Sequence, residues 1–189
     1  MFEGWDSFYL MVGGAAGGLI GLLFVVATLT RGRDRDSALH GASVYMSPVV
    51  LHMALALTIS ALACAPGVPT GLSATAIGVA GLIGLVASAR VIYHLAIAKT
   101  FPGAHWTDLW FYGLAAFVAD LALTGSAFEV WMGAPEIAAR EVAAGVVAIL
   151  LIAIRNAWDL VTWISAVNNT AEGAAGPQDG SGPDYSAKS

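Results

Sequence analysis

Six ionisable side chains lie inside long apolar runs of the chain, where a charge is costly. At the centre of a bilayer such a group costs about 2.5 to 3.5 kcal/mol or more, so it normally faces the interior of a helical bundle and has a partner or a function. We therefore expect these residues to form a polar intramembrane site. They are His52, Arg90, His94, Asp120, Arg155 and Asp159.

The depth of these residues follows from a helical rise of about 1.5 Å per residue. Counted from the predicted cytoplasmic ends of their helices, His52, Arg90 and Arg155 lie about 12 Å deep and share one layer. Asp120 lies about 17 Å deep, near the midplane of a hydrocarbon core about 30 Å thick. Four of the five predicted helices thus contribute to one polar stack in the cytoplasmic half of the membrane.

Two kinds of transport chemistry fit this set if it lines a hydrated cavity open to the cytoplasm. His52, His94 and Asp120 are suited to relay protons, because histidine gains and loses a proton near neutral pH. Arg90 and Arg155 are suited to hold a small anion, because a guanidinium group offers several N–H donors. The first functional hypothesis is therefore permeation or transport of protons or of a small anion.

A structural role for the same charges is the second hypothesis. The two arginines balance the two aspartates in charge. Asp159 is expected to pair with Arg90 or Arg155 and to lock two helices together, while Asp120 is neutral or hydrogen-bonded. In this interpretation the protein is a non-catalytic accessory or scaffold subunit of a membrane complex.

The membrane histidines also suggest a third hypothesis, a b-type haem electron carrier. His52 and His94 come from consecutive helices at similar depth and are candidate axial ligands. Their predicted depths differ by about 6 Å, and the same helices carry no second pair of histidines. Haem therefore ranks third, and the leading hypothesis involves no cofactor.

The sequence lacks the motifs of soluble catalytic sites. It contains no G-x-S-x-G, no phosphate-binding loop, no H-E-x-x-H and no C-x-x-C, which argues against the corresponding hydrolases, nucleotide enzymes and metalloproteins. Ser47 and Ser88 are expected to bond their own helix backbones rather than to act as nucleophiles. We predict neither an enzymatic activity nor a metal site.

The composition excludes most soluble classes of protein. Of the 189 residues, 58% are hydrophobic and 11% are charged, which is too few charges to cover a water-exposed surface. The net charge of -5 and the absence of a basic stripe argue against a nucleic-acid partner. The single cysteine, Cys64, excludes an intrachain disulfide. The lipid bilayer is the expected partner.

Five apolar runs predict an all-α bundle of five transmembrane helices, each long enough to cross a core about 30 Å thick. The acidic and aromatic N-terminus differs from the basic start of a signal peptide, so the first helix is expected to be retained. Residues 168–189 are small and polar and are predicted to form a disordered cytoplasmic tail. The predicted transmembrane domain covers residues 1–167, with helices at about 8–29, 44–65, 72–98, 109–128 and 142–163.

The distribution of basic residues predicts the orientation, because short cytoplasmic loops are enriched in Lys and Arg. With five helices, Arg31, Arg33 and Arg35 share a side with Lys99 and the C-terminal tail, and the opposite side has only Arg140. The N-terminus is therefore expected outside and the C-terminus in the cytoplasm. This describes a multi-pass protein of a bacterial-type inner membrane.

Glycines in the first predicted helix form a surface for close helix packing. Without side chains, another helix approaches closely and gains dispersion contacts in lipid. A matching series of small residues makes the helix at 72–98 the expected partner, with a homo-oligomer or a larger membrane complex as the alternative. The packing glycines are Gly13, Gly14, Gly17, Gly18 and Gly21.

One stretch of the chain resembles a known group of proteins. The string WDSFYLMVGGAAGGLIGLLFVVATL is similar to the opening of an uncharacterised family of small bacterial multi-pass membrane proteins, with its aromatic start, paired glycines and GLLFV core. The resemblance is limited to the first helix. It implies a membrane location and no activity.

Overall fold

A computed structural model describes residues 1–29, 35–97 and 109–174 of the chain. Within these ranges it contains helices and no strands, which confirms the all-helical class. Five helical rods can be traced, and two of them combine an α-helical and a π-helical part. The elements are α1 (Asp6–Leu29), α2 (Arg35–Cys64), α3 (Thr70–Ile92) continued by η1 (Tyr93–Ile97), η2 (Leu109–Leu114) continued by α5 (Ala115–Trp131), and α6 (Pro135–Ala174).

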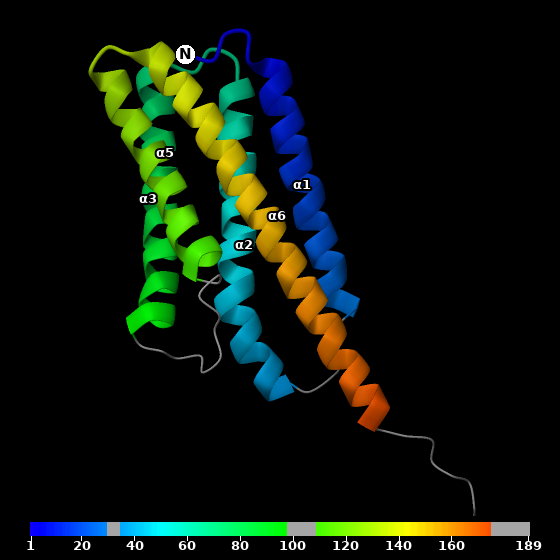
Figure 1. The fold of residues 1–189 in the computed structure, drawn as a ribbon. Helices are drawn as coiled ribbons and strands as arrows, with labels where there is room; N and C mark the ends of the chain where they lie inside the picture. Colours follow the sequence, from blue (N-terminus) through cyan, green and yellow to red (C-terminus); the bar gives the residue numbers. More distant parts are fainter. Residues whose placement is uncertain (30–34, 98–108, 175–189) are drawn as a thin grey trace, which may run out of the picture.

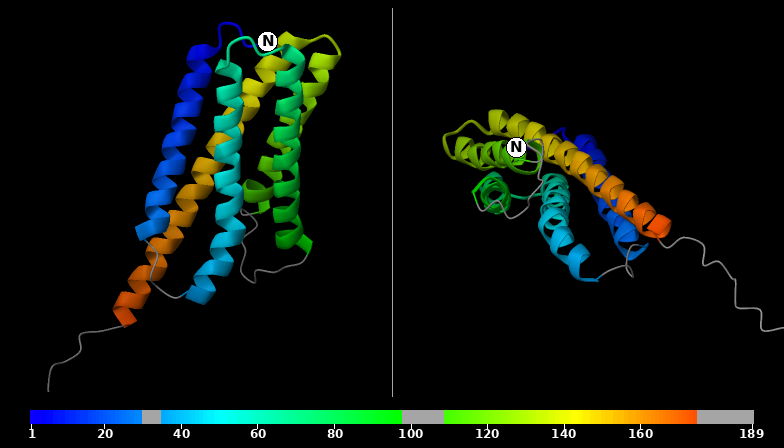
Figure 2. Two further views of the ribbon diagram at one scale, coloured as in Figure 1. Left: turned by 180° about the vertical axis from the view of Figure 1, so that it is seen from behind. Right: turned by 60° about the horizontal axis from the view of Figure 1, so that its bottom comes forward.

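Successive rods run in opposite directions (Figure 1, Figure 2). The chain's N-terminus, the turn between α2 and α3 and the turn between α5 and α6 lie at one end of the bundle, which we call the N-side. The ends of α1, η1 and α6 lie at the other end, the C-side. The odd number of rods thus places the start of α1 and the end of α6 at opposite ends.

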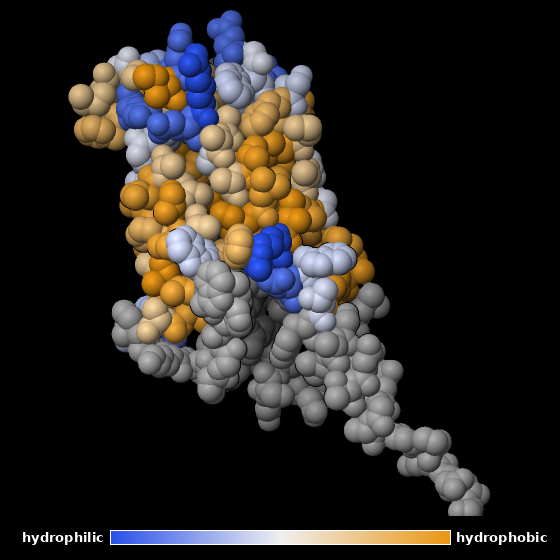
Figure 3. Space-filling view, in the orientation of Figure 1, coloured by the Kyte–Doolittle hydropathy of each residue, from blue (hydrophilic) through white to orange (hydrophobic). Residues whose placement is uncertain are grey.

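Four rods are long and apolar enough to cross a membrane: α1, α3 with η1, η2 with α5, and α6. The described apolar part of α2, Pro48–Cys64, is shorter, at about 25 Å for a rise of about 1.5 Å per residue. Apolar side chains form a broad band across the middle of the visible face, and hydrophilic ones gather at its N-side end (Figure 3). These features are those of a multi-pass membrane protein.

Two helices have bounds that differ from the predicted ones. α2 begins at Arg35 rather than at residue 44, so Pro48 stands inside the helix and not in its first turn. α6 begins at Pro135 rather than at about residue 142, and it continues to Ala174 rather than to residue 163. Residues 164–174 favour or tolerate helix, and no proline follows Pro135 until Pro177. Residues 168–174 of the predicted tail are therefore helical, and residues 175–189 lie outside the described part.

The turn between α5 and α6 has a sequence that ends one helix and starts the next. Gly133 has a φ of 84°, in the left-handed region that glycine adopts readily. The Ala134 N–H donates to the Glu129 carbonyl at 2.9 Å. The Gly133 N–H donates to the Val130 carbonyl at 3.1 Å, which completes a Schellman motif. Pro135 then begins α6, where no N–H donor is needed, so the two helices form a tight antiparallel hairpin.

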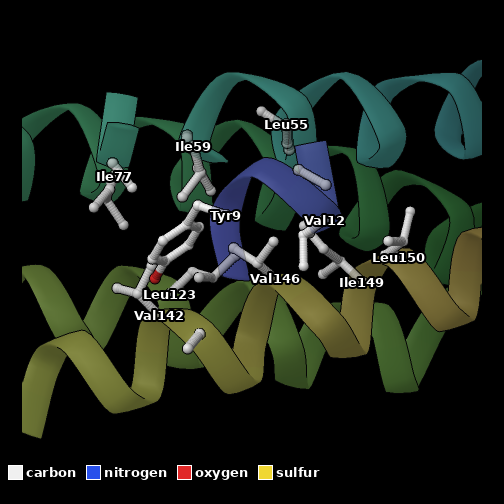
Figure 4. Close-up of a cluster of buried hydrophobic side chains, with 14 of the residues drawn as sticks. Tyr9, Val12, Leu55, Ile59, Ile77, Leu123, Val142, Val146, Ile149 and Leu150 are labelled. Carbon is white, nitrogen blue, oxygen red and sulfur yellow. The ribbon is translucent and has the colours of Figure 1, made fainter. Parts of the chain in front are cut away.

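Two clusters of buried apolar side chains hold the rods together. The larger, which we call the N-side cluster, brings side chains of α1, α2, α3, α5 and α6 around Tyr9 (Figure 4). In lipid, close packing rather than escape from water stabilises such contacts. The N-side cluster includes Val12, Leu55, Ile59, Ile77, Leu123, Val142, Val146 and Ile149. The smaller C-side cluster consists of Leu23, Val49, Met53, Val91, Ala153 and Ala157.

α3 and α5 pack through a line of glycines on α3. An ideal Cβ at Gly78 would lie 2.9 Å from the Ala127 Cβ. One at Gly81 would lie 2.8 Å from the backbone nitrogen of Thr124. Real Cβ atoms essentially never come this close to another atom. Only glycine therefore allows the observed separation of the two helices.

The glycines of α1 have a different partner from the predicted one. α1 packs against α2 and to a lesser extent against α6, because α5 occupies the small-residue face of α3. Gly13 makes the close contact, with 2.9 Å from its ideal Cβ to the Ser60 Cβ, whereas Gly17 reaches only Leu57, at 4.0 Å. An added Cβ would meet no atom of the described residues within 4 Å at Gly14, Gly18 and Gly21.

We expect Gly81→Ala to destabilise the protein by about 1 to 3 kcal/mol, because the added methyl group forces α3 and α5 apart. Gly18→Ala is the matched control, and we expect it to be neutral or stabilising by about 1 kcal/mol, because alanine favours helix. Thermal unfolding of the purified variants measures both effects. Equal melting temperatures for the two variants would contradict the close packing of α3 and α5 at the glycines of α3.

The arrangement of the rods also predicts a topology that reporter fusions can measure. We expect a reporter at the N-terminus to be outside and one at the C-terminus to be in the cytoplasm. The reason is that Arg31, Arg33 and Lys99 belong in the sequence to the connections that follow α1 and η1, and short cytoplasmic connections are enriched in Lys and Arg. Both termini on one side would show that one rod, with α2 as the shortest apolar candidate, does not cross. A cytoplasmic N-terminus with an external C-terminus would show that the orientation is the reverse of the one expected.

Candidate functional site

A carboxyl group lies at the centre of the bundle. Asp120 stands midway along the 23-residue segment Leu109–Trp131, which is long and apolar enough to span a membrane. Its side chain is fully buried, with 0% of its surface exposed. α5 holds it against α3, and His52 of α2 reaches it from the other side. Its depth in a membrane stays a prediction.

Two side chains form hydrogen bonds with one oxygen of this carboxyl group. Ser88 Oγ, on α3, donates to Asp120 Oδ2 at 2.7 Å. His52 Nε2, on α2, lies 3.0 Å from the same oxygen. Both partners are buried. The site therefore joins three helices through a single carboxylate oxygen.

The second nitrogen of the imidazole is also engaged. His52 Nδ1 lies 2.8 Å from the carbonyl oxygen of Pro48, one helical turn earlier on α2. This contact fixes the ring so that Nε2 points away from α2 and toward Asp120. The position of Pro48 inside the helix thus places a carbonyl acceptor directly at the site.

Glycines on α3 provide the space that the carboxyl group occupies. An ideal Cβ at Gly84 would collide with Asp120 Oδ1, and one at Gly81 would lie 3.0 Å from the Asp120 backbone oxygen. The same backbone oxygen accepts a hydrogen bond from Thr124 Oγ1 at 2.9 Å. Oδ1 itself has no hydrogen-bond partner among the described residues. The carboxyl group is therefore anchored by Oδ2 and packed against bare backbone at Oδ1.

These hydrogen bonds determine how many protons the site holds. A carbonyl oxygen can only accept, so His52 Nδ1 carries a hydrogen and donates it to Pro48. Nε2 and Asp120 Oδ2 then form a hydrogen bond only if one proton lies between them. That proton belongs either to an imidazolium beside a carboxylate or to a carboxylic acid beside a neutral imidazole. In both cases the pair has no net charge, which makes its burial tolerable.

Arg155 and Asp159 form an ion pair within α6. Arg155 Nη1 donates to Asp159 Oδ2 at 2.8 Å, at the i,i+4 spacing of helix neighbours. The two side chains are 36% and 42% exposed. The Arg155 guanidinium also lies over the ring of Phe111, 3.9 Å from its centroid. Of the two pairings predicted for Asp159, the structure has the one inside a single helix, and it locks no helices together.

Arg90 and His94 do not join the central site. Both side chains are exposed on the rod formed by α3 and η1. His94 packs edge to face against Tyr93, with ring centroids 5.6 Å apart. The structure thus brings together His52 and Asp120 from the predicted set, and it places the other four residues elsewhere. A haem iron would need a free ring nitrogen from each histidine of the predicted pair. Both ring nitrogens of His52 are already hydrogen-bonded.

Two further residues shape this site and were not assigned to it from the sequence. Ser88 was expected to bond its own backbone, but its hydroxyl donates to Asp120. Gly84 belongs to the small residues of the predicted helix at 72–98, and it makes room for the carboxyl group. The signal was present in the spacing, because positions 81, 84 and 88 share one face of a helix. A face made of two glycines and a serine can hold a bulky polar partner.

A third missed residue lies on the C-side. Asn156 is buried on α6, and its Nδ2 donates to the Phe111 carbonyl oxygen at 3.3 Å. Phe111 belongs to η2, whose π-helical turns depart from regular α-helical bonding. Asn156 therefore ties η2 to α6. An amide inside an apolar run is the sequence feature that marks it.

Comparisons with known protein families, with curated protein sequences and with solved structures give no match to this chain. A function must therefore be argued from the geometry of the site. The distinctive feature is a fully buried histidine and carboxyl pair with one proton between them.

Variants of Asp120 and Ser88 should show whether the charge or the shape of the central carboxyl group stabilises the protein. We expect Asp120→Ala to destabilise the protein by about 3 to 5 kcal/mol, because it leaves a buried histidine without its partner. Ser88→Ala removes one hydrogen bond to the carboxylate and should cost about 1 to 3 kcal/mol. Asp120→Asn keeps the shape and donates to a neutral imidazole, so it should cost about 1 kcal/mol or less.

Thermal and denaturant unfolding of the three purified variants measures this order of stability. An Asp120→Ala variant as stable as the parent would show that the pair is not buried as described. An Asp120→Asn variant as unstable as Asp120→Ala would show that a full charge, and not a shared proton, holds the site together.

Proposed function

We propose that the protein moves protons across a membrane and that the hydrogen bond between His52 and Asp120 is its proton-binding site. One observation carries the proposal: His52 Nε2 lies 3.0 Å from Asp120 Oδ2 in a buried pair. A hydrogen bond between these two atoms requires one proton between them. The pair lies midway along a segment able to span a membrane. Ionisable groups at such depth commonly belong to proton relays.

The charge states of the pair suggest how it works. With one proton the pair is neutral. Loss of that proton leaves a carboxylate facing an imidazole lone pair, and gain of a second leaves an imidazolium beside a carboxylic acid. Both of these states carry net charge, which an apolar bundle disfavours. The site therefore favours a cycle of two steps. The pair takes up a proton from one side of the membrane and then releases a proton to the other side.

The geometry supports protons better than a small anion. An anion site needs guanidinium groups that converge on one point. Arg155 is instead paired with Asp159 and stacked on Phe111, and Arg90 is exposed on α3. The central pair itself offers a carboxyl group, which repels anions when it is ionised.

The location proposed for this activity is a bacterial-type inner membrane. The basis is the collection of basic residues on the C-side, which faces the cytoplasm under the positive-inside rule. Protons bound at the midplane would then move between the N-side exterior and the cytoplasm.

A second candidate is an accessory subunit in which the pair only joins α2, α3 and α5. Its support is the complete burial of the pair between the N-side and C-side clusters. Such a lock needs the hydrogen bonds of the site but no exchangeable proton. The two candidates therefore differ in what the Asp120→Asn variant does.

We expect purified protein in proteoliposomes to conduct protons, measured with an internal pH-sensitive dye after a potassium-valinomycin potential is applied. Asp120→Asn should lower the flux about a hundredfold or more, because the amide cannot accept and release the proton. Asp159→Asn, the same change in a partly exposed carboxylate of α6, should leave the flux near that of the parent.

Flat traces from folded parent protein would reject proton transport and favour the accessory role. Equal loss of flux in both variants would show a general sensitivity to charge, and would remove the special role of Asp120. Anion-selective probes in the same vesicles should give no Arg155-dependent signal.

A further inference from the structure

A hollow of about 300 Å³ opens at the N-side end of the bundle. Its walls come from the first residues of the chain, the start of α1, the end of α2 and the start of α3. Two carboxylates, Glu3 and Asp6, line it together with the polar side chains of Cys64, Thr70 and Ser73. Ser73 is buried at this wall. The hollow thus combines apolar walls with two carboxylates and several polar side chains, and the carboxylates favour water and cations at its mouth.

Two buried hydroxyl groups lie one helical turn below this hollow. Ser60 precedes Cys64 by four residues on α2, and Tyr9 follows Asp6 by three residues on α1. Both side chains are almost completely buried. Neither hydroxyl group has a hydrogen-bond partner among the described residues. Buried polar groups are nearly always hydrogen-bonded, to protein or to ordered water.

The Tyr9 side chain places its hydroxyl group inside the bundle, at the level of Val142 (Figure 4). It crosses from α1 with its hydroxyl group directed toward Leu123 and Val142, inside the N-side cluster (Figure 4). Leu123 follows Asp120 by three residues on α5, so it stands one turn above the central pair. Asp120 Oδ1 is the next buried oxygen without a partner.

These unpartnered atoms all lie at the central pair or on its N-side. C-side of the pair come Val49 and Val91, one turn from His52 and Ser88, within the apolar C-side cluster. The side-chain atoms concerned, in the part of the chain that the structure describes, are Tyr9 OH, Ser60 Oγ, Asp120 Oδ1 and Glu129 Oε2. Among the described residues, the unpartnered buried oxygens therefore mark an approach from the N-side.

We propose that the N-side hollow is the mouth of a water-filled proton path that runs past Ser60 and Tyr9 to Asp120 Oδ1. The proposal rests on the proposed function and adds the route and the side of access. Water molecules hydrogen-bonded to the two hydroxyl groups carry the proton inward from hydronium at the acidic mouth.

The last transfer starts from hydronium at the inner end of the path. One of its O–H bonds breaks, a new O–H bond forms at Asp120 Oδ1, neutral water remains, and the pair gains one positive charge. The proton between Oδ2 and Nε2 stays on the imidazole, so the site becomes an imidazolium beside a neutral carboxyl group. The Nε2 proton then passes to a water molecule that enters from the C-side, and the carboxyl group turns until its new O–H faces Nε2. The neutral pair with one proton between the two groups is restored.

Cys64 provides a direct test, because it is the only cysteine of the chain and lines the hollow. A membrane-impermeant cationic methanethiosulfonate added to the N-side of proteoliposomes should modify it. We expect the proton flux of the parent to fall about tenfold, since the adduct fills the mouth with a positive charge. A reducing agent should restore the flux, and Cys64→Ser protein should conduct normally and ignore the reagent.

A second set of variants tests the interior of the path. Tyr9→Phe and Ser60→Ala each remove one hydroxyl group, and each should lower the flux about two- to tenfold, the equivalent of one hydrogen bond. Ser126→Ala is the matched control, because Ser126 is buried on the same side but its hydroxyl group donates to the Leu123 carbonyl at 2.8 Å. It should leave the flux unchanged.

The outcomes separate this inference from the proposed function. If unmodified parent protein shows no Asp120-dependent flux, the proposed function fails. If the flux depends on Asp120 but complete modification of Cys64, confirmed by mass spectrometry, leaves it unchanged, the path alone is wrong. Failure of Cys64 to react would also overturn the path, because a mouth for water must admit the reagent. Normal flux in both hydroxyl variants would place the route elsewhere.

Discussion

A carboxyl group at the centre of an apolar bundle is stable only if its charge is neutralised and its oxygens find donors. Asp120 meets this requirement through one oxygen, which accepts from Ser88 and shares a proton with His52. The imidazole in turn needs an acceptor behind it, and the Pro48 carbonyl supplies it. The hydrogen bonds of one carboxylate oxygen therefore link the three helices that carry these groups.

One unusual feature of the sequence follows from this requirement. A line of glycines runs along α3, where it costs helix propensity. It allows α5 to approach until the carboxyl group rests on backbone. The glycines are unfavourable for the helix alone and are explained by the central pair.

Much of the architecture could be predicted from the sequence, because apolar runs and turn residues are local signals. The helices, and the place of Asp120 midway along an apolar run, depend only on the position of residues along the chain. The face that a residue occupies depends on which helices are neighbours, which composition does not encode. Arg90 and His94 were therefore assigned to the interior although they are exposed, and α1 was assigned to α3 although it packs on α2. For the same reason, the partner of Ser88 became visible only in three dimensions.

The protonation of the two ring nitrogens of His52 tests the central claim most directly. Solid-state ¹⁵N NMR of the protein in bilayers, with the His52 signals assigned by their loss in His52→Gln, reports which nitrogen carries a hydrogen. The account predicts a protonated Nδ1 in all conditions, and an Nε2 signal that changes when Asp120 is replaced by asparagine. An unprotonated Nδ1, or an Nε2 signal unaffected by Asp120→Asn, would contradict a shared proton between His52 and Asp120.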